Sequence, residues 1–166
     1  NNMEVYNIHI QDPKVQINNF NFIVVPEHDR LEGENVIKSK GAIHYITDEE
    51  IQGAKALALS KNVLTVILGG PTKHYSFSLG ELKQLFHKIE LLFLHKVEEV
   101  KIVSSRRTPE LVVSFLQDRY KDNARVVVDS SLSRKNYIEA LAQAKKIIVT
   151  SDSISMLSEA ATTGVP

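Results

Sequence analysis

Four groups of small, hydroxyl-bearing or charged residues follow apolar runs of the sequence. They are Gly69-Gly70-Pro71-Thr72, Ser104-Ser105-Arg106-Arg107, Asp129-Ser130-Ser131 and Thr150-Ser151-Asp152-Ser153. Glycine lets a backbone approach an anion closely, and arginine gives charge-assisted hydrogen bonds to phosphate oxygens. Helix N-caps alone would place serine, threonine and aspartate in such positions, but they do not account for a Gly-Gly and an Arg-Arg pair. If the four groups meet in space, they predict an anion-binding site.

The segment after the last of these groups has helical spacing and one acidic residue beyond its first turn. Its apolar face, which we expect to pack on a sheet, carries Ile154, Leu157 and Ala161. Glu159 shares another face with Ser155, and it stands too far along to act only on the helix dipole. A carboxylate near a serine-rich helix start suits the vicinal hydroxyls of a ribose. A solvated helix face with one glutamate is equally typical, so the residues alone leave both interpretations open.

Other residue types that carry chemistry give weaker patterns. Gly69-Gly70 matches neither a Walker loop nor the G-x-G-x-x-G fingerprint, so we expect neither a P-loop NTPase nor a standard dinucleotide fold. His9 and His28 lack the spacing of zinc ligands, and we expect no metal site. His74 is expected either to contact phosphate or to face solvent. No Ser-His-Asp arrangement follows from order and spacing, so the catalytic residues stay unassigned.

The composition restricts the class of protein. Of the 166 residues, 43% are hydrophobic and 24% are charged, as in ordinary globular domains. Twenty basic residues balance twenty acidic ones, so no net charge favours a nucleic-acid partner. The sequence has no cysteine, and its apolar runs are shorter than the ~20 residues of a membrane span. The polar start Asn-Asn-Met-Glu-Val is not expected to act as a signal peptide.

The candidate site residues need a fold that brings strand ends together. Continuous runs rich in β-branched residues predict buried strands at 63–68, 100–104, 125–128 and 146–149, and each is followed by a segment of helical spacing. This alternation predicts an α/β fold, a Rossmann-like parallel sheet with helices on both faces. In such sheets ligands bind outside the carboxyl ends of the strands, which is where the four polar groups stand.

Two helix starts carry the spacing of a capping box, in which a hydroxyl and an acid three residues later cap each other's amides. The pairs are Thr47 with Glu50 and Ser78 with Glu81. The helix that begins after Thr47 is expected to end near Leu59.

The rhythm of strands and helices becomes regular only after residue 61, which predicts two domains. Residues 1–61 contain short strands at 5–10 and 22–25, an irregular segment and the first helix, too little to bury a core of their own. Residues 62–166 contain the four buried strands. We therefore expect the tail of an earlier domain followed by the sheet that carries the site.

The motifs taken together resemble one known family. ILGGPTKHY, SSRRTP and NYIEALAQAKKIIVTSDSISMLSEAATTGVP, preceded by HIQDP, FNFIVVPEHD and NVIKSKGAIHYIT, occur in order along nearly the whole chain. They resemble the mitochondrial-fission "elongated mitochondria" family, whose bacterial members are described as predicted nucleotide-sugar-binding proteins. Members of this family are similar to glycosyltransferases of the GT-B type, in which the second of two Rossmann-like domains binds the sugar-nucleotide donor. The resemblance implies that 1–61 is the remnant of the first domain and its linker, and 62–166 an incomplete donor domain.

The resemblance also implies a ligand, a nucleoside-diphosphate sugar that serves as substrate, with no cofactor. Gly69 and Gly70 would lie at the donor phosphates, Arg106 and Arg107 belong to the SRRTP loop, and Glu159 matches the acidic residue that holds the donor ribose. The complete predicted site comprises Gly69, Gly70, Pro71, Ser105, Arg106, Arg107, Thr150, Ser151, Asp152, Ser153, Ser155, Met156 and Glu159.

Two functions follow from the resemblance. The first is a metal-independent, glycosyltransferase-like protein that binds the donor and is inactive as this piece, because the acceptor half is expected to lie outside the sequence. The second is a non-catalytic adaptor in membrane or organelle division that uses the same fold as a scaffold. Either would act in the bacterial cytoplasm or at the cytosolic face of an organelle. Further expectations are peripheral membrane association through parts outside this chain and self-association through an open sheet edge.

Overall fold

The computed structural model describes residues 5–57, 60–73 and 75–166. The expected helix end near Leu59 and the candidate phosphate contact His74 lie outside the described residues. The chain forms two compact units, Asn1–Tyr45 and Ile46–Pro166.

The first unit is a parallel sheet of three short strands in the order β1-β2-β3. The strands are β1 (Ile8–Ile10), β2 (Phe22–Pro26) and β3 (Val36–Ser39), with 3-10 turns at Ile17–Asn19 and Glu27–Asp29. Ile23 and Val25 are fully buried on one face of β2. β3 was not predicted, and its residues were expected to be irregular. Four residues with only two apolar side chains are too few to show the alternation of a strand.

The second unit alternates strands and helices around one sheet in the order β6-β5-β4-β7. The strands are β4 (Val63–Leu68), β5 (Glu99–Ser104), β6 (Val126–Asp129) and β7 (Ala144–Val149). The helices are α1 (Asp48–Ala56), α2 (Leu79–Ile89) with a π-helical turn at Glu90–Leu94, α3 (Glu110–Tyr120), α4 (Arg134–Gln143) and α5 (Ile154–Ala161). All four strands are parallel, which confirms the predicted Rossmann-like α/β class.

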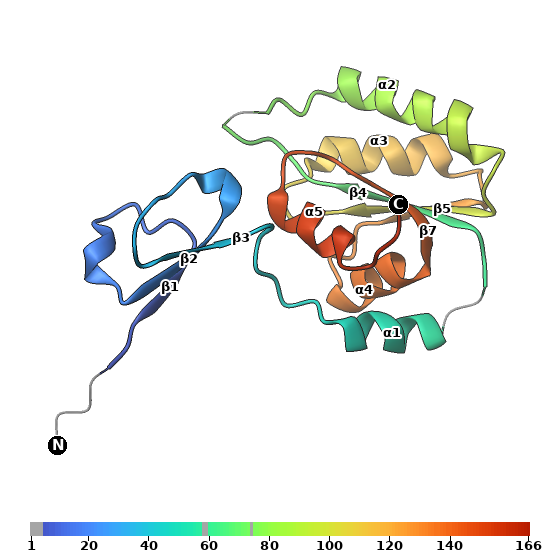
Figure 1. The fold of residues 1–166 in the computed structure, drawn as a ribbon. Helices are drawn as coiled ribbons and strands as arrows, with labels where there is room; N and C mark the ends of the chain where they lie inside the picture. The colour runs from blue at the N-terminus through green and yellow to red at the C-terminus, as the bar shows by residue number, and fades with distance from the viewer. Residues whose placement is uncertain (1–4, 58–59, 74) are drawn as a thin grey trace. The chain divides into compact units, whose positions relative to one another are not determined.

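Helices cover both faces of this sheet (Figure 1). α2 and α3 pack on one face, where Phe86 and Leu116 are buried against the strands. α4 and α5 pack on the other face together with α1, and Leu141 is fully buried there. Every residue of the central strand β4 is buried, and its one polar side chain, Thr65, donates to the Ala140 carbonyl at 2.7 Å. This hydrogen bond ties the middle of β4 to α4.

Both predicted capping boxes are present. Thr47 Oγ1 accepts from the Glu50 amide at 3.3 Å and Ser78 Oγ accepts from the Glu81 amide at 3.2 Å, and each glutamate caps in return. The helix that Thr47 starts then packs on α4, with Ile51 buried between them. The two units consequently divide before α1, earlier than the predicted boundary after residue 61.

The sheet of the second unit ends at β6 on one side and β7 on the other. On the β7 edge, the Ile147 amide donates to the Pro166 carbonyl at 2.9 Å. That edge is thus partly occupied by the chain itself, and self-association through it stays a prediction.

A cluster of polar side chains joins the π-helical turn to α3. The Arg119 guanidinium donates two hydrogen bonds to Glu90, at 2.8 and 2.7 Å, and the Tyr120 hydroxyl donates a third at 2.7 Å. The hydrogen bond from Arg119 is the largest of the effects that lower the pKa of Glu90 below its ordinary value of 4.5. The pair therefore stabilises the fold through the ionised form of the acid.

Glu90→Gln should lower the free energy of unfolding by about 1 kcal/mol near neutral pH, since the two side chains are 25% and 30% exposed and water screens the pair. A carboxyl whose pKa is lower in the folded state contributes stability above its unfolded pKa and loses it as the pH falls through the folded pKa. The difference between parent and variant should accordingly shrink below pH 4.5. Urea unfolding of parent and variant above and below this pH measures the difference in their free energies of unfolding. A difference that does not change with pH would mean that the substitution acts through packing and not through the charge of Glu90.

Candidate functional site

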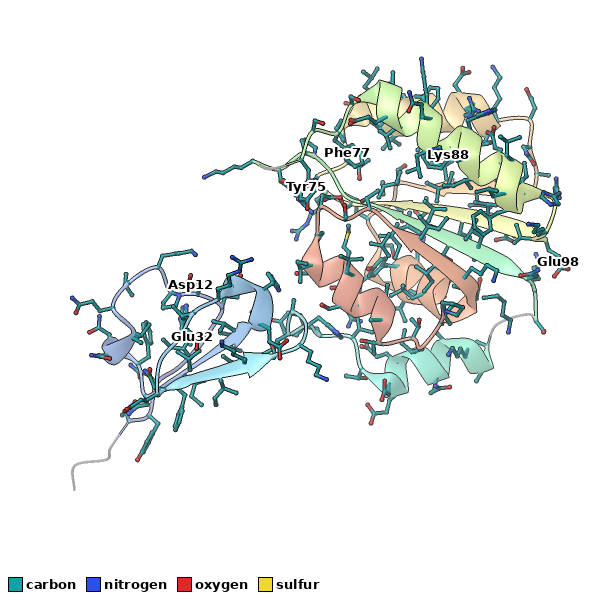
Figure 2. All side chains as sticks on the ribbon, turned by 45° about the horizontal axis from the view of Figure 1, so that its top comes forward. Asp12, Glu32, Tyr75, Phe77, Lys88 and Glu98 are labelled. Atoms are coloured by element: carbon teal, nitrogen blue, oxygen red, sulfur yellow. The ribbon has the colours of Figure 1, made fainter. Side chains whose placement is uncertain are left out.

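A cleft of about 410 Å³ lies between the carboxyl ends of β4, β5 and β6 and the helices α4 and α5. In Figure 2 the labels Tyr75 and Phe77 lie near this end of the sheet. The label Glu98, a residue just before β5, lies near the opposite end. The apolar floor of the cleft consists of Ile67, Val103 and Met156, and its walls carry Ser104, Ser105, Arg106, Asp129, Leu132, Ser133, Arg134, Tyr137 and Glu159. The predicted residues Ser105, Arg106, Met156 and Glu159 thus meet in one cavity.

Glu159 of α5 and Tyr137 of α4 form a hydrogen-bonded pair at this cleft. The Tyr137 hydroxyl donates to Glu159 Oε2 at 2.7 Å, and both side chains are half-buried. Burial raises the pKa of Tyr137 and the bond to Glu159 raises it further, so the hydroxyl stays a donor at any ordinary pH. Across residues 5–57, 60–73 and 75–166, Glu159 makes no second hydrogen bond or ion pair. Its Oε1 can therefore accept from a ligand.

Two arginines line the same cleft and differ in their partners. The exposed side chain of Arg106 makes no hydrogen bond or ion pair with any residue that the structure describes. Arg134 instead pairs with Glu50 of α1 through both ends of its guanidinium, with Nη2 to Oε2 at 3.0 Å. Arg106 is thus the better placed cation for an anionic ligand.

The loop between β6 and α4 forms the remaining wall. Burial alone would raise the pKa of Asp129, but hydrogen bonds from Ser131 and Asn136 outweigh it and lower that pKa. The Ser131 amide donates to Asp129 Oδ1 at 2.8 Å, and Ser133 caps α4. Leu132 takes a left-handed conformation, with φ 56°, and is 55% exposed beside the cleft. Leucine rarely adopts this conformation, and strained residues of this kind gather at ligand sites.

Five other predicted site residues contact one another and do not line this cleft: Gly69, Gly70, Arg107, Thr150 and Asp152. The Gly69 amide donates to Thr150 Oγ1 at 2.8 Å, and the Gly70 amide donates to Asp152 Oδ2 at 3.0 Å. A Cβ at Gly69 would lie 2.0 Å from Asp152 Oδ2, and one at Gly70 would lie 2.0 Å from the Arg107 carbonyl oxygen. Both glycines are therefore required by the packing of the protein itself. Their expected contact with phosphate stays a prediction.

The last four predicted residues lie around these groups. Pro71 and Ser155 are exposed, and Ser153 caps the start of α5. Ser151 lines a smaller cavity of about 250 Å³ beside Tyr75 (Figure 2). None of the four lines the larger cleft.

The face of α5 that packs on the sheet differs from the predicted one. Met156 and Ala160 are buried, whereas Ile154, Leu157 and Ala161 are exposed. The prediction was wrong because apolar residues stand on two faces of this short helix, so their spacing did not select one. The long, unbranched Met156 side chain reaches the core, and the small Ala160 lets the helix lie close to it.

The complete predicted site leaves out eight residues that line the cleft: Ile67, Val103, Ser104, Asp129, Leu132, Ser133, Arg134 and Tyr137. Ser104 and Asp129 belong to the polar groups that were expected at strand ends, although the predicted site did not include them. Leu132, Ser133 and Arg134 follow soon after β6, so the same reasoning could have been extended to them. Tyr137 stands one turn into α4, and its partner lies 22 residues away in the sequence. No spacing rule connects that pair.

Within the part of the chain that the structure describes, no three His, Asp or Glu side chains gather closely enough to hold a metal ion. In the same residues, no helix combines the length and the apolar character needed to span a membrane.

A parallel sheet with helices on both faces and a cleft at its carboxyl edge defines a Rossmann-like α/β unit. The family described as Mitochondrial fission ELM1 matches residues 1–166, and the chain belongs to it. The chain is 27% identical to the mitochondrial fission protein ELM1 of Arabidopsis thaliana, over 98% of this chain and 44% of that protein. It is 33% identical to an uncharacterised protein of Rickettsia prowazekii, over 84% of this chain and 41% of the relative. The chain spans less than half the length of both curated relatives.

Proposed function

We propose that the cleft binds a nucleoside-diphosphate sugar, as the donor-binding part of a glycosyltransferase-like protein. The observation that carries this proposal is the Glu159 carboxylate, half-buried at the cleft, held by Tyr137 at one oxygen. The resemblance of the family to GT-B glycosyltransferases supports the same ligand.

The ribose is expected at Glu159. A ribose presents two neighbouring hydroxyl donors, and a carboxylate oxygen that has no other partner accepts from them. Because Tyr137 holds the other oxygen at 2.7 Å, little rotamer freedom remains to be lost on binding. The nearby apolar side chains Leu132 and Met156 suit the flat face of a base.

The diphosphate is expected at Arg106. Arg106 lines the cleft beside Ser105, and hydrogen bonds between a guanidinium and phosphate are strong because both groups are charged. In a transfer reaction the same charge would stabilise the leaving diphosphate. We assign no catalytic base.

Titration of the parent protein with a uridine-diphosphate sugar, uridine diphosphate and uridine tests this proposal. We expect saturable binding of all three, with the diphosphate tighter than the nucleoside by at least about tenfold, because only the diphosphate reaches Arg106. Guanosine and adenosine diphosphates belong in the same series, since the base is not fixed by Glu159 or Arg106. Absence of binding by every nucleoside diphosphate at millimolar concentration would rule the proposal out.

The second candidate function is that of an interaction protein in membrane or organelle division. Its support is membership of the Mitochondrial fission ELM1 family and the name of the Arabidopsis relative. In that case the fold serves as a scaffold, and action at the cytosolic face of an organelle or in a bacterial cytoplasm would fit it. The titration separates the two candidates, because a scaffold does not require nucleotide binding.

A further inference from the structure

Asp152 is a buried carboxylate at which three hydrogen bonds converge. Its side chain is 3% exposed. It accepts from the Gly70 amide at 3.0 Å, from Arg107 Nη2 at 2.8 Å and from Thr150 Oγ1 at 2.6 Å. These donors belong to the loops that follow β4, β5 and β7. One side chain therefore ties together three of the loops at the carboxyl edge of the sheet, and we call these four residues the Asp152 cluster.

The loop that carries Arg106 is fixed on both sides. Before it, the Ser105 amide donates to Thr108 Oγ1 at 2.9 Å, and the Thr108 amide donates back to the Ser105 carbonyl at 3.0 Å. Thr108 Oγ1 also lies 2.7 Å from the Gly69 carbonyl oxygen, within reach to donate to it. After it, the Arg107 side chain is bound to Asp152. Arg106 thus lies in a turn whose neighbouring residues on both sides are hydrogen-bonded to other parts of the unit.

The two neighbouring arginines consequently have different electrostatic roles. The charge of Arg107 compensates a carboxylate that is almost fully buried, and a buried carboxylate is costly without such a partner. Arg106 lines the cleft and has no partner among the residues that the structure describes. The carboxylate thus holds one guanidinium in the structure and leaves the other for a ligand.

We propose that Asp152 is a positioning residue: through Arg107 it holds the loop so that Arg106 faces the cleft and meets the phosphates of the ligand. This inference rests on the proposed nucleotide binding and assigns Arg107 and Gly70 to support of the site, not to ligand contact.

The test is the gain in affinity that phosphate brings, taken as the ratio of the dissociation constants of uridine and uridine diphosphate. NMR titration reaches millimolar constants, so it can measure both ligands, and a thermal melt of each variant reports stability separately. Arg106→Ala should reduce the ratio by about tenfold or more and leave the melt unchanged. Arg107→Ala and Asp152→Asn should lower the melting temperature and reduce the ratio at least about fivefold, with uridine itself bound as by the parent. Arg107→Lys keeps the charge opposite Asp152 and should restore most of the ratio.

Arg119→Ala is the matched control. It breaks another arginine–carboxylate contact, to Glu90, in the cluster between the π-helical turn and α3, away from the cleft. It should lower stability and leave the ratio unchanged. If Arg107→Ala destabilises the protein and also leaves the ratio unchanged, the Asp152 cluster is merely structural and the inference is overturned. Tighter diphosphate binding by Asp152→Asn would overturn it as well, because Asp152 would then be withholding Arg107 from the ligand. A parent that binds neither ligand would instead refute the proposed function, and the inference with it.

Discussion

Gly70→Ala is expected to lower the free energy of unfolding by about 3 kcal/mol, the upper end of what overpacking usually costs. An alanine Cβ would lie 2.0 Å from the Arg107 carbonyl oxygen and 2.4 Å from its carbonyl carbon. Relief would require the Arg107 backbone to move. The Asp152 cluster resists this, since the Gly70 amide and the Arg107 side chain bind the same carboxylate oxygen.

Urea unfolding followed by circular dichroism measures this effect, and Gly80→Ala provides the control. Gly80 lies in α2, where the nearest atom to an added Cβ is Ser78 Oγ at 4.0 Å. Alanine is the better helix former there, so the control should be stabilised by up to about 1 kcal/mol. A Gly70→Ala variant within experimental error of the parent would mean that the loop is looser than its hydrogen bonds indicate.

Much of the fold followed from the sequence because one physical pattern determined it. A strand buried on both faces must be apolar throughout, and the run from Val63 to Leu68 leaves few alternatives. The capping boxes at Thr47 and Ser78 were equally local. The structure groups α1 with the second compact unit, whereas the sequence suggested the earlier domain. The sequence could not show this grouping, because Ile51 packs on α4, a helix far along the chain. β3 was not predicted because a strand of four residues is too short to show a period.

The sequence indicated at which strand ends a candidate site would lie. It did not indicate which of these residues line the cleft and which bind other residues of the protein. A Gly-Gly pair after a strand shows only that a Cβ has no room, not whether ligand or protein fills the space. At Gly69 the carboxylate of Asp152 fills it. Arg106 and Arg107 are likewise identical in type and adjacent in sequence, and only their partners distinguish them. The Tyr137–Glu159 pair could not be predicted from the sequence, because it joins two helices that only tertiary packing brings together.

Glu159→Ala is expected to weaken nucleoside binding by on the order of 2 kcal/mol, about thirtyfold. Removing the carboxylate would leave ribose hydroxyls unpaired in a half-buried cleft. It would also deprive the Tyr137 hydroxyl of its acceptor, so the free energy of unfolding should fall by about 1 kcal/mol. Glu139→Ala is the control, because Glu139 lies on α4 and does not line this cleft.

Comparison of uridine with 2′,3′-dideoxyuridine isolates the contact. The parent should prefer uridine by up to the same factor of about thirty. The Glu159→Ala variant should hardly distinguish the two nucleosides, because the carboxylate and the ribose hydroxyls are the two partners of one interaction, which is already lost in the variant. Pyrophosphate, which has no ribose, should bind parent and variant alike. Should the variant keep the full preference for uridine, the ribose does not bind at Glu159. The carboxylate would then serve only to hold Tyr137, and the case for a donor site in this cleft would rest on Arg106 alone.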